Sequence, residues 1–162
     1  MDLLIMSFTG FSDDIDPSII VANATFWPDI NLAQFQSGYR LPGEYRQEVL
    51  QTRLQLAMLW ANGQLNDWKI EQEALGFVDL DSVTGNESTD LGTEKRLNIL
   101  YVRAVSCHAK ALLLADYQTM MRKSDAQNDA KESEDTADRW HHMATNAIND
   151  IKGSLKIHAE AL

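Results

Sequence analysis

Residues 50–75 read LQTRLQLAMLWANGQLNDWKIEQEAL. Apolar side chains recur here at intervals of about 3.5 residues, the spacing of a helix that buries one stripe in a bundle. The stripe comprises Leu50, Leu54, Ala57, Ala61, Gln64, Trp68 and Leu75, widened by Met58 and Leu65. Gly63 interrupts it, and a mid-helix glycine costs roughly 1 kcal/mol relative to alanine. The stretch therefore predicts a long amphipathic helix from about residue 43 to 75, kinked or broken near Asn62-Gly63 and ended by Gly76 as its C-cap.

Two later segments show the same helical spacing. The inward face of the first, within 94–124, is expected to hold Leu97, Tyr101, Ala104, His108, Ala111 and Ala115. The inward face of the second segment, the last helix, is expected to hold Ala137, Trp140, Ala144, Ile148, Ile151 and Leu155. Residues 77–92 are polar and aperiodic, which predicts a loop, and 124–135 read as a connection or a frayed helix start. No segment alternates as a strand would, so the predicted fold class is all-α, a bundle of three to four helices.

The N-terminal residues lack a helical period but are rich in apolar side chains. A disordered segment would usually hold fewer of them. We therefore expect an extended N-terminal arm that packs on its own bundle or on a neighbouring subunit, with a short helix near 16–22 as an alternative. Prolines favour helix starts, so Pro28 and Pro42 are expected to open a short helix and the long one. The predicted division is an arm at 1–25, a helical bundle at 26–152 and a short C-terminal tail at 153–162.

The net charge of the chain is −10. Proteins that read nucleic-acid sequence need clustered cations for phosphate contacts, so this class is disfavoured. The charge is uneven, however, because residues 125–135 are strongly acidic whereas 94–124 are basic. The cations of that basic segment are Lys95, Arg96, Arg103, Lys110, Arg122 and Lys123. Two interpretations stay open: charge matching between copies of the chain, or a solvated helix face beside an acidic turn.

The sequence offers no catalytic or metal-binding pattern. The adjacent pairs Cys107-His108 and His141-His142 point about 100° apart on a helix, whereas helical chelation needs a spacing of three or four. His108 lies on the apolar stripe, which favours a packed core or interface histidine, and Cys107 reads as a small packed thiol. There is no phosphate-binding glycine loop, no Gly-x-Ser-x-Gly and no CxxC. We expect no enzyme activity, no cofactor and no metal.

The compartment follows from cysteine use and hydropathy. A single cysteine cannot form an internal disulfide, which fits a reducing cytosol. The start of the chain lacks the basic and apolar regions of a secretion signal. No stretch of roughly 20 apolar residues was found for a membrane span. A soluble chain with no membrane partner is expected.

Trp27 is the tryptophan best placed for an interface. Helical spacing accounts for Trp68 and Trp140 as core residues, whereas Trp27 stands where the helical period has not begun. Tryptophan is concentrated at interface hot spots. Trp60 lies off the main stripe and can face a partner or a second apolar groove.

Several blocks, taken in order, resemble the head-completion (head–tail connector) family of tailed bacteriophages with contractile tails. The blocks are Phe26-Trp27-Pro28-Asp29-Ile30, then Leu65, Trp68 and Gly76-Phe77 with Leu80 and Val83, then Tyr101, Arg103-Ala104-Val105, Ala109, Ala111, Leu113 and Tyr117, and finally Trp140 and Met143. The resemblance spans about residues 26 to 152. It is carried by the order and spacing of the blocks rather than by any one of them.

The resemblance implies a virion protein assembled in the host cytoplasm and located at the head–tail neck. About twelve copies would form a ring beneath the portal protein after DNA packaging, closing the filled head and offering a platform to the next neck or tail-terminator protein. Packaged DNA would pass close by without specific contact. The C-terminal tail would reach the portal. Candidate portal or neighbour contacts are Trp27, Arg103, Arg122, Lys123, Leu155, Ile157 and Leu162.

Two other classes remain open on the residues alone. The chain can be a small acidic helical adaptor that binds a single protein partner, which a 1:1 stoichiometry would favour. It can also be an enzyme using Cys107, His108 or His141, which stoichiometric zinc in the purified protein would favour.

Overall fold

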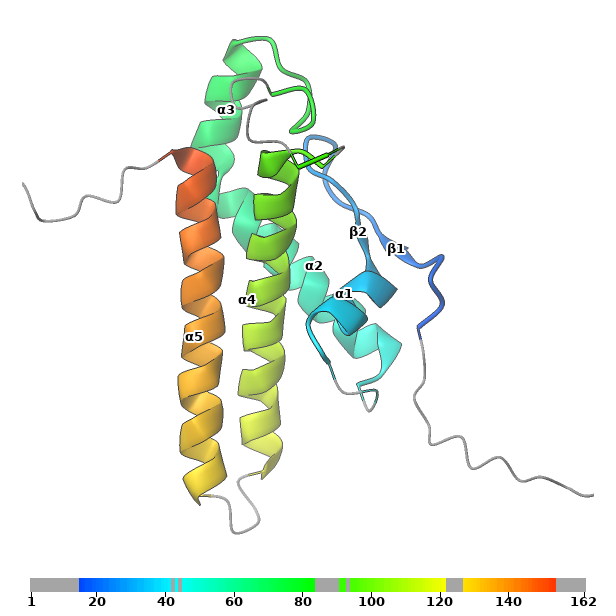
Figure 1. Ribbon diagram of the computed structural model, residues 1–162, viewed down its shortest axis with the longest axis vertical. Coiled ribbons are helices and arrows are strands. Elements are labelled where there is room, and N and C mark those ends of the chain that lie inside the picture. Colours follow the sequence, from blue (N-terminus) through cyan, green and yellow to red (C-terminus); the bar gives the residue numbers. More distant parts are fainter. Residues whose placement is uncertain are drawn as a thin grey trace, which may run out of the picture.

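The computed structural model describes residues 15–41, 43, 45–83, 91–92, 94–121 and 127–153. Two very short strands and a short helix come first, followed by four longer helices (Figure 1). In chain order the elements are β1 (Ile20–Val21), β2 (Ile30–Asn31), α1 (Leu32–Gly38), α2 (Gln47–Gln64), α3 (Asn66–Ala74), α4 (Arg96–Met121) and α5 (Gln127–Lys152). The protein is thus mainly helical, as predicted.

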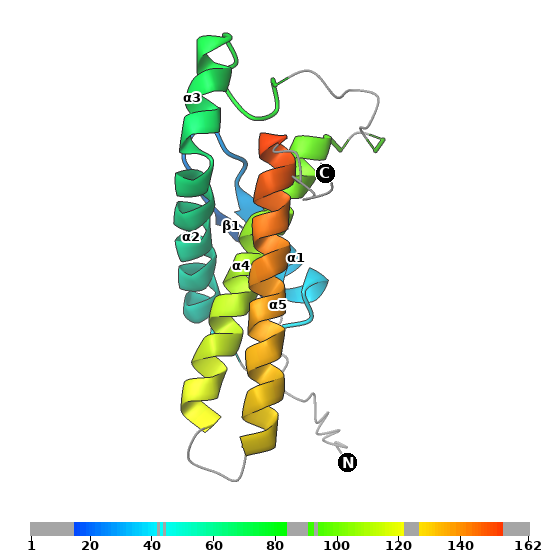
Figure 2. The ribbon, with the colours of Figure 1, turned by 90° about the vertical axis from the view of Figure 1, so that its left-hand side faces the viewer.

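Helix α4 is the centre of the molecule. It lies side by side with α5 along the long axis, and α2 packs against it from another side (Figures 1 and 2). Helix α3 continues beyond α2 and projects past the ends of α4 and α5. The core runs between these helices and includes Leu50, Leu54, Tyr101, Ala104 and Ile148, all nearly inaccessible to solvent.

The long helix predicted for 43–75 is broken, as the glycine in its middle suggested, but the break falls at Leu65. The Leu65 backbone N–H donates to the carbonyl of Ala61, and its side chain is fully buried. Because Leu65 is buried at the break, it stays packed in the core where α3 changes direction from α2. Gly76 has φ 97°, the left-handed conformation of a C-cap glycine, as predicted.

The small antiparallel sheet corrects the expectation that no strand is present. Ile20 pairs with Asn31 and Val21 with Ile30. Two residues per strand are too few to produce a visible alternation, so sequence reasoning missed them. Pro28 consequently precedes β2 rather than opening a helix. Helix α1 starts at Leu32, after the Asn31 side chain has capped the Gln34 N–H at 2.9 Å.

The described part of the expected N-terminal arm belongs to the bundle. Ile15 and Val21 are buried members of the core. Of the two expected packing partners, this segment therefore uses its own bundle. Residues 1–14 and the tail residues 154–162 lie outside the described residues.

The remaining boundaries differ from the predictions in small ways. Helix α2 begins at Gln47, several residues after Pro42-Gly43, and α5 begins at Gln127, so most of the polar run 124–135 is helix. Gly153, with φ 61°, follows the end of α5. Ala115, expected on the inward face of α4, is exposed.

Helix α4 also corrects the expectation that no segment has the hydropathy of a membrane span. Arg96–Asp116 is 21 residues long, with a mean hydropathy of 1.3, so it qualifies by length and composition. The core helix of a water-exposed bundle passes the same test. Here the segment packs between α2 and α5, and 44% of the tested window is buried inside the fold.

Candidate interaction surface

Trp27 lies in an aromatic block instead of at the surface. Its ring stacks on Tyr101 of α4 at 4.8 Å and 9°, and on Trp68 of α3 at 6.3 Å. Phe26 packs edge-on against it at 4.9 Å. Only 5% of Trp27 is exposed. Trp27, the tryptophan predicted for an interface, is therefore covered by aromatic rings of its own chain.

A hydrogen-bond network holds this block in place. The Tyr101 hydroxyl donates to Asn62 Oδ1 and accepts from Asn23 Nδ2 at 2.8 Å. Asn62 Nδ2 donates in turn to Asn23 Oδ1 at 3.0 Å. Burial raises the pKa of Tyr101, so the hydroxyl keeps its proton and stays a donor. The segment between β1 and β2 is thereby tied to both α2 and α4.

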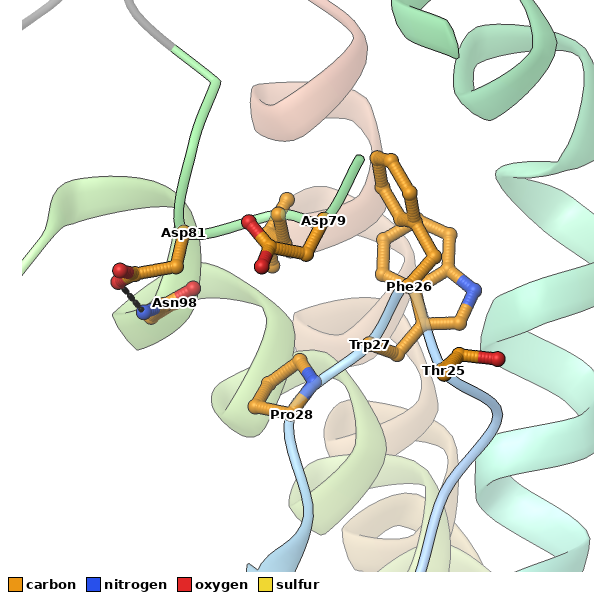
Figure 3. A pocket seen from close by; sticks show the side chains of 8 residues that line it. Thr25, Phe26, Trp27, Pro28, Asp79, Asp81 and Asn98 are labelled. Carbon is orange, nitrogen blue, oxygen red and sulfur yellow. Dashed lines mark hydrogen bonds between the residues drawn. The ribbon is translucent and has the colours of Figure 1, made fainter. Parts of the chain in front are cut away.

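A small hollow lies where the Phe26–Pro28 segment meets the loop after α3 (Figure 3). Its volume is about 160 Å³, and its lining residues are Thr25, Phe26, Trp27, Pro28, Asp79, Leu80, Asp81 and Asn98. The Leu80 N–H donates to the Phe26 carbonyl at 2.9 Å, and Asn98 donates to Asp81 at 3.1 Å. Enclosed small-molecule sites are usually about 300–1,000 Å³. This hollow is therefore better suited to one side chain of a partner.

Most described cations in α4 and directly before it are already engaged within the chain. Lys95 pairs with Asp81, and Arg96 donates to the Asp150 carbonyl of α5. Lys110 donates to the Tyr39 carbonyl at 2.7 Å and lies 4.3 Å from the centre of the Trp140 ring. Arg103 is exposed and makes no hydrogen bond or ion pair to the residues that the structure describes.

Two of the predicted basic contacts, Arg122 and Lys123, lie outside the described residues, as do Leu155, Ile157 and Leu162 of the tail. Of the seven residues predicted from the sequence, the structure thus places only Trp27 and Arg103. It does not bring these two together as one surface, because the first is buried and the second is exposed.

Exposed apolar side chains on α2 and α3 were not anticipated. Val49 and Leu56 of α2 are seven residues apart and Ile70 of α3 follows fourteen residues later, with Leu59 between Leu56 and Ile70. Leu59 is 69% exposed, Ile70 54%, Leu56 43% and Val49 39%. We call these four residues the α2–α3 outer face. The signal was present in the sequence, because Leu56 and Leu59 are apolar yet lie off the core stripe.

A hollow of about 350 Å³ adjoins this outer face. It is formed by residues 22–24 on one side and by Gln55, Met58, Leu59 and Asn62 of α2 on the other. An exposed apolar stripe beside a concavity is typical of surfaces that bind another protein.

The residues considered for chemistry have different surroundings. Cys107 is fully buried, and burial raises the pKa of its thiol, so it packs as predicted and is poorly suited to act as a nucleophile. His141 and His142 are exposed on α5, whereas His108 is partly buried on α4.

Two comparisons with known proteins identify the family. Residues 21–162 match the family model described as "Phage head completion protein (GPL)". The chain belongs to this family of phage head completion proteins. It is also 30% identical to a "Probable head completion/stabilization protein" of Haemophilus phage HP1, over 146 residues that cover 90% of this chain and 93% of that protein. No solved structure matches the chain significantly.

The resemblance inferred from the sequence is thereby confirmed. The chain is a head completion protein of a phage and hence a component of the virion. The family is one of structural proteins rather than enzymes.

Proposed function

We propose that this head completion protein binds the portal vertex after DNA packaging, as a ring of about twelve copies, and forms there the platform of the head–tail neck. The observation that supports this most directly is the α2–α3 outer face. A virion protein with a long apolar stripe on its surface is suited to burying that stripe against another virion protein.

The energetics favour assembly on a template. Burying apolar surface contributes about 25 cal/mol per Å². Four partly exposed side chains therefore supply only a weak contact per copy. A ring of copies bound to one symmetric partner multiplies such contacts, because each bound copy holds the next at high effective concentration. A chain that is monomeric when alone can thus saturate a portal ring.

Arg103 is proposed as a lateral contact in this ring. It is the described cation of α4 that stays exposed and unpaired within the described residues. The acidic residues 125–135 of a neighbouring copy are its proposed partners. The charge-matching interpretation is therefore kept, but for Arg103 rather than for the whole basic segment. Arg122 and Lys123 remain proposed members of the same contact.

The tail residues Leu155, Ile157 and Leu162 remain proposed contacts to the portal. All described core residues lie between Ile15 and Ile151. A chain that ends at Gly153 is therefore expected to fold but to bind the portal ring less tightly. Unchanged binding of this shortened chain would remove the tail from the proposal.

The acidic balance suggests a role toward packaged DNA. A channel lined by subunits with a net charge of −10 repels the duplex, so DNA can slide through without sticking. Lysine in place of channel-facing carboxylates is expected to slow DNA ejection. Ejection at the normal rate would count against this role.

Light scattering with the portal ring of the same phage tests the proposed function. The chain alone is expected to be monomeric and to form a saturated complex with the portal. Leu56→Ser combined with Leu59→Ser is expected to weaken that complex. Val78→Ser, at a residue 77% exposed and outside the outer face, is the matched control and is expected to bind normally.

The outcomes separate the candidate functions. A chain that stays monomeric with the portal overturns the proposal. A strict 1:1 complex with another protein would instead support the alternative, a small acidic adaptor for a single partner.

A further inference from the structure

A cluster of three rings lies where α2, α4 and α5 meet. Trp60 of α2 stacks on His108 of α4, with ring centres 4.1 Å apart and planes 4° from parallel. His141 of α5 contacts both rings, and its Nδ1 lies 3.2 Å from Nδ1 of His108. We propose that His108 and His141 chelate one divalent transition ion of the kind that prefers imidazole: Zn²⁺, Cu²⁺ or Ni²⁺.

The separation of the two nitrogens suits this role. Zinc binds histidine nitrogen at about 2.0–2.1 Å, so two nitrogens on a tetrahedral ion lie roughly 3.3–3.4 Å apart. The observed 3.2 Å needs only a small adjustment. Without a metal the two nitrogens share a hydrogen bond, in which one ring donates and the other accepts, so metal binding moves the proton of the donor ring from Nδ1 to Nε2.

Packing restrains the orientation of His108, one of the two proposed ligands. The parallel stack on Trp60 restrains the plane of the His108 ring, and the partly buried position restricts its rotamers. A ligand fixed before binding loses less conformational freedom when the metal arrives. His141 is exposed, so solvent and ions reach the pair from its side.

The selectivity follows from the ligand type. Imidazole suits zinc, copper and nickel, whereas Mg²⁺ and Ca²⁺ prefer oxygen ligands. Within the described residues no group of three His, Cys, Asp or Glu side chains is placed to hold an ion. Neighbouring Cys107 is buried in the core. The ion would therefore keep open coordination positions, which water fills in the isolated chain.

Tryptophan fluorescence of the full-length chain, titrated with Cu²⁺ at pH 7, tests the site. Copper bound beside Trp60 is expected to quench its emission, and added Zn²⁺ is expected to compete and restore it. His141→Ala is expected to raise the half-quenching concentration at least about tenfold. His142→Ala removes a neighbouring exposed histidine of the same helix and is expected to leave the titration unchanged.

Two further variants secure the assignment. Trp60→Phe is expected to abolish most of the quenching, which attributes the signal to this tryptophan among four. His108→Ala is expected to weaken binding as His141→Ala does, with circular dichroism checking its fold. The exposed His141 keeps the test decisive if the buried variant unfolds. Equal effects of His141→Ala and His142→Ala, or no quenching of the unmodified chain, would overturn the proposal.

Discussion

At the scale of single residues, one hydroxyl links three parts of the fold. Tyr101 of α4 hydrogen-bonds Asn62 of α2 and Asn23 between the strands, while its ring stacks on Trp27. Tyr101 is fully buried. A buried polar group is costly when its partner is removed, so this network is sensitive to small changes.

Tyr101→Phe tests the network. The variant keeps the aromatic stack but leaves the two asparagines without their shared partner, so we expect a loss of about 1–3 kcal/mol in unfolding free energy. Urea unfolding measures it. In the double variant with Asn62→Ala the two losses are expected to be non-additive, because both remove the same hydrogen bond. Full additivity would show that the bond contributes nothing.

The stability of the folded chain is expected to depend on pH through His108. Its pKa is about 4 in the folded chain and 6.5 is its ordinary value. Between these values the unfolded chain takes up a proton that the folded chain resists, so stability falls as the pH drops from 6.5 toward 4. His141 on α5 is the titratable group that faces it, and Trp60 covers the ring from α2.

His108→Phe isolates this effect, because phenylalanine can stack on Trp60 but cannot titrate. We expect the wild-type chain to lose up to about 1 kcal/mol per pH unit more than the variant over this range, less where solvent screens the ring. Urea unfolding at pH 7 and pH 5 measures both. If the unfolding free energies of the wild-type chain and the variant fall equally between pH 7 and pH 5, His108 does not titrate as described.

At the scale of elements, exposed apolar side chains occur on both sides of the break between α2 and α3. Val49 and Leu56 of α2 are seven residues apart and Ile70 of α3 follows fourteen residues later, with Gly63 at the intervening heptad position. A heptad interval on an exposed face is the pattern of a helix that meets another helix.

Two glycines on either side of α3 give a matched test of backbone freedom. A Cβ at Gly63 or at Gly76 would meet nothing within 4 Å. Gly63 is inside α2, so Gly63→Ala is expected to stabilise the isolated chain by about 0.5–1 kcal/mol. Gly76 has φ 97°, so Gly76→Ala is expected to destabilise it by about 1 kcal/mol. Thermal unfolding measures both, and changes of the same sign would contradict the described backbone.

At the scale of the whole molecule, the cations in α4 and directly before it differ in whether other elements of the chain engage them. Lys95, Arg96 and Lys110 hold the chain's own elements together. Arg103 is exposed, and contact with a neighbouring copy is its proposed role. Isolated surface ion pairs contribute only about 0–1 kcal/mol. Such a pair matters only when it is repeated around a ring.

Arg103→Glu is expected to lower the number of copies bound per portal at moderate salt, without changing the thermal stability of the monomer. Lysine substitutions at Asp129, Glu132 or Glu134 are expected to restore it if those residues face Arg103 of a neighbour. Arg46→Glu makes the same charge change at another exposed site and is the control. Failure of every compensating partner would leave lateral charge matching unsupported.

The amino-acid sequence by itself determined the main features of this protein. The helical spacing of apolar residues predicted the bundle, because burying an apolar stripe is a local periodic requirement. The glycines predicted the interruption of the long helix and the C-cap at Gly76, because their backbone freedom is a property of the residue. The ordered blocks from Phe26 to Met143 indicated the family.

The tertiary structure alone decided which side chains are free to meet a partner. Trp27 was predicted as an interface residue but is covered by Tyr101 and Trp68, which come from distant parts of the chain. His108 and His141 are separated by 33 positions, so no local spacing rule could pair them. Exposure and pairing depend on how whole helices pack against one another, and that arrangement is a sum over many weak contacts rather than a local pattern.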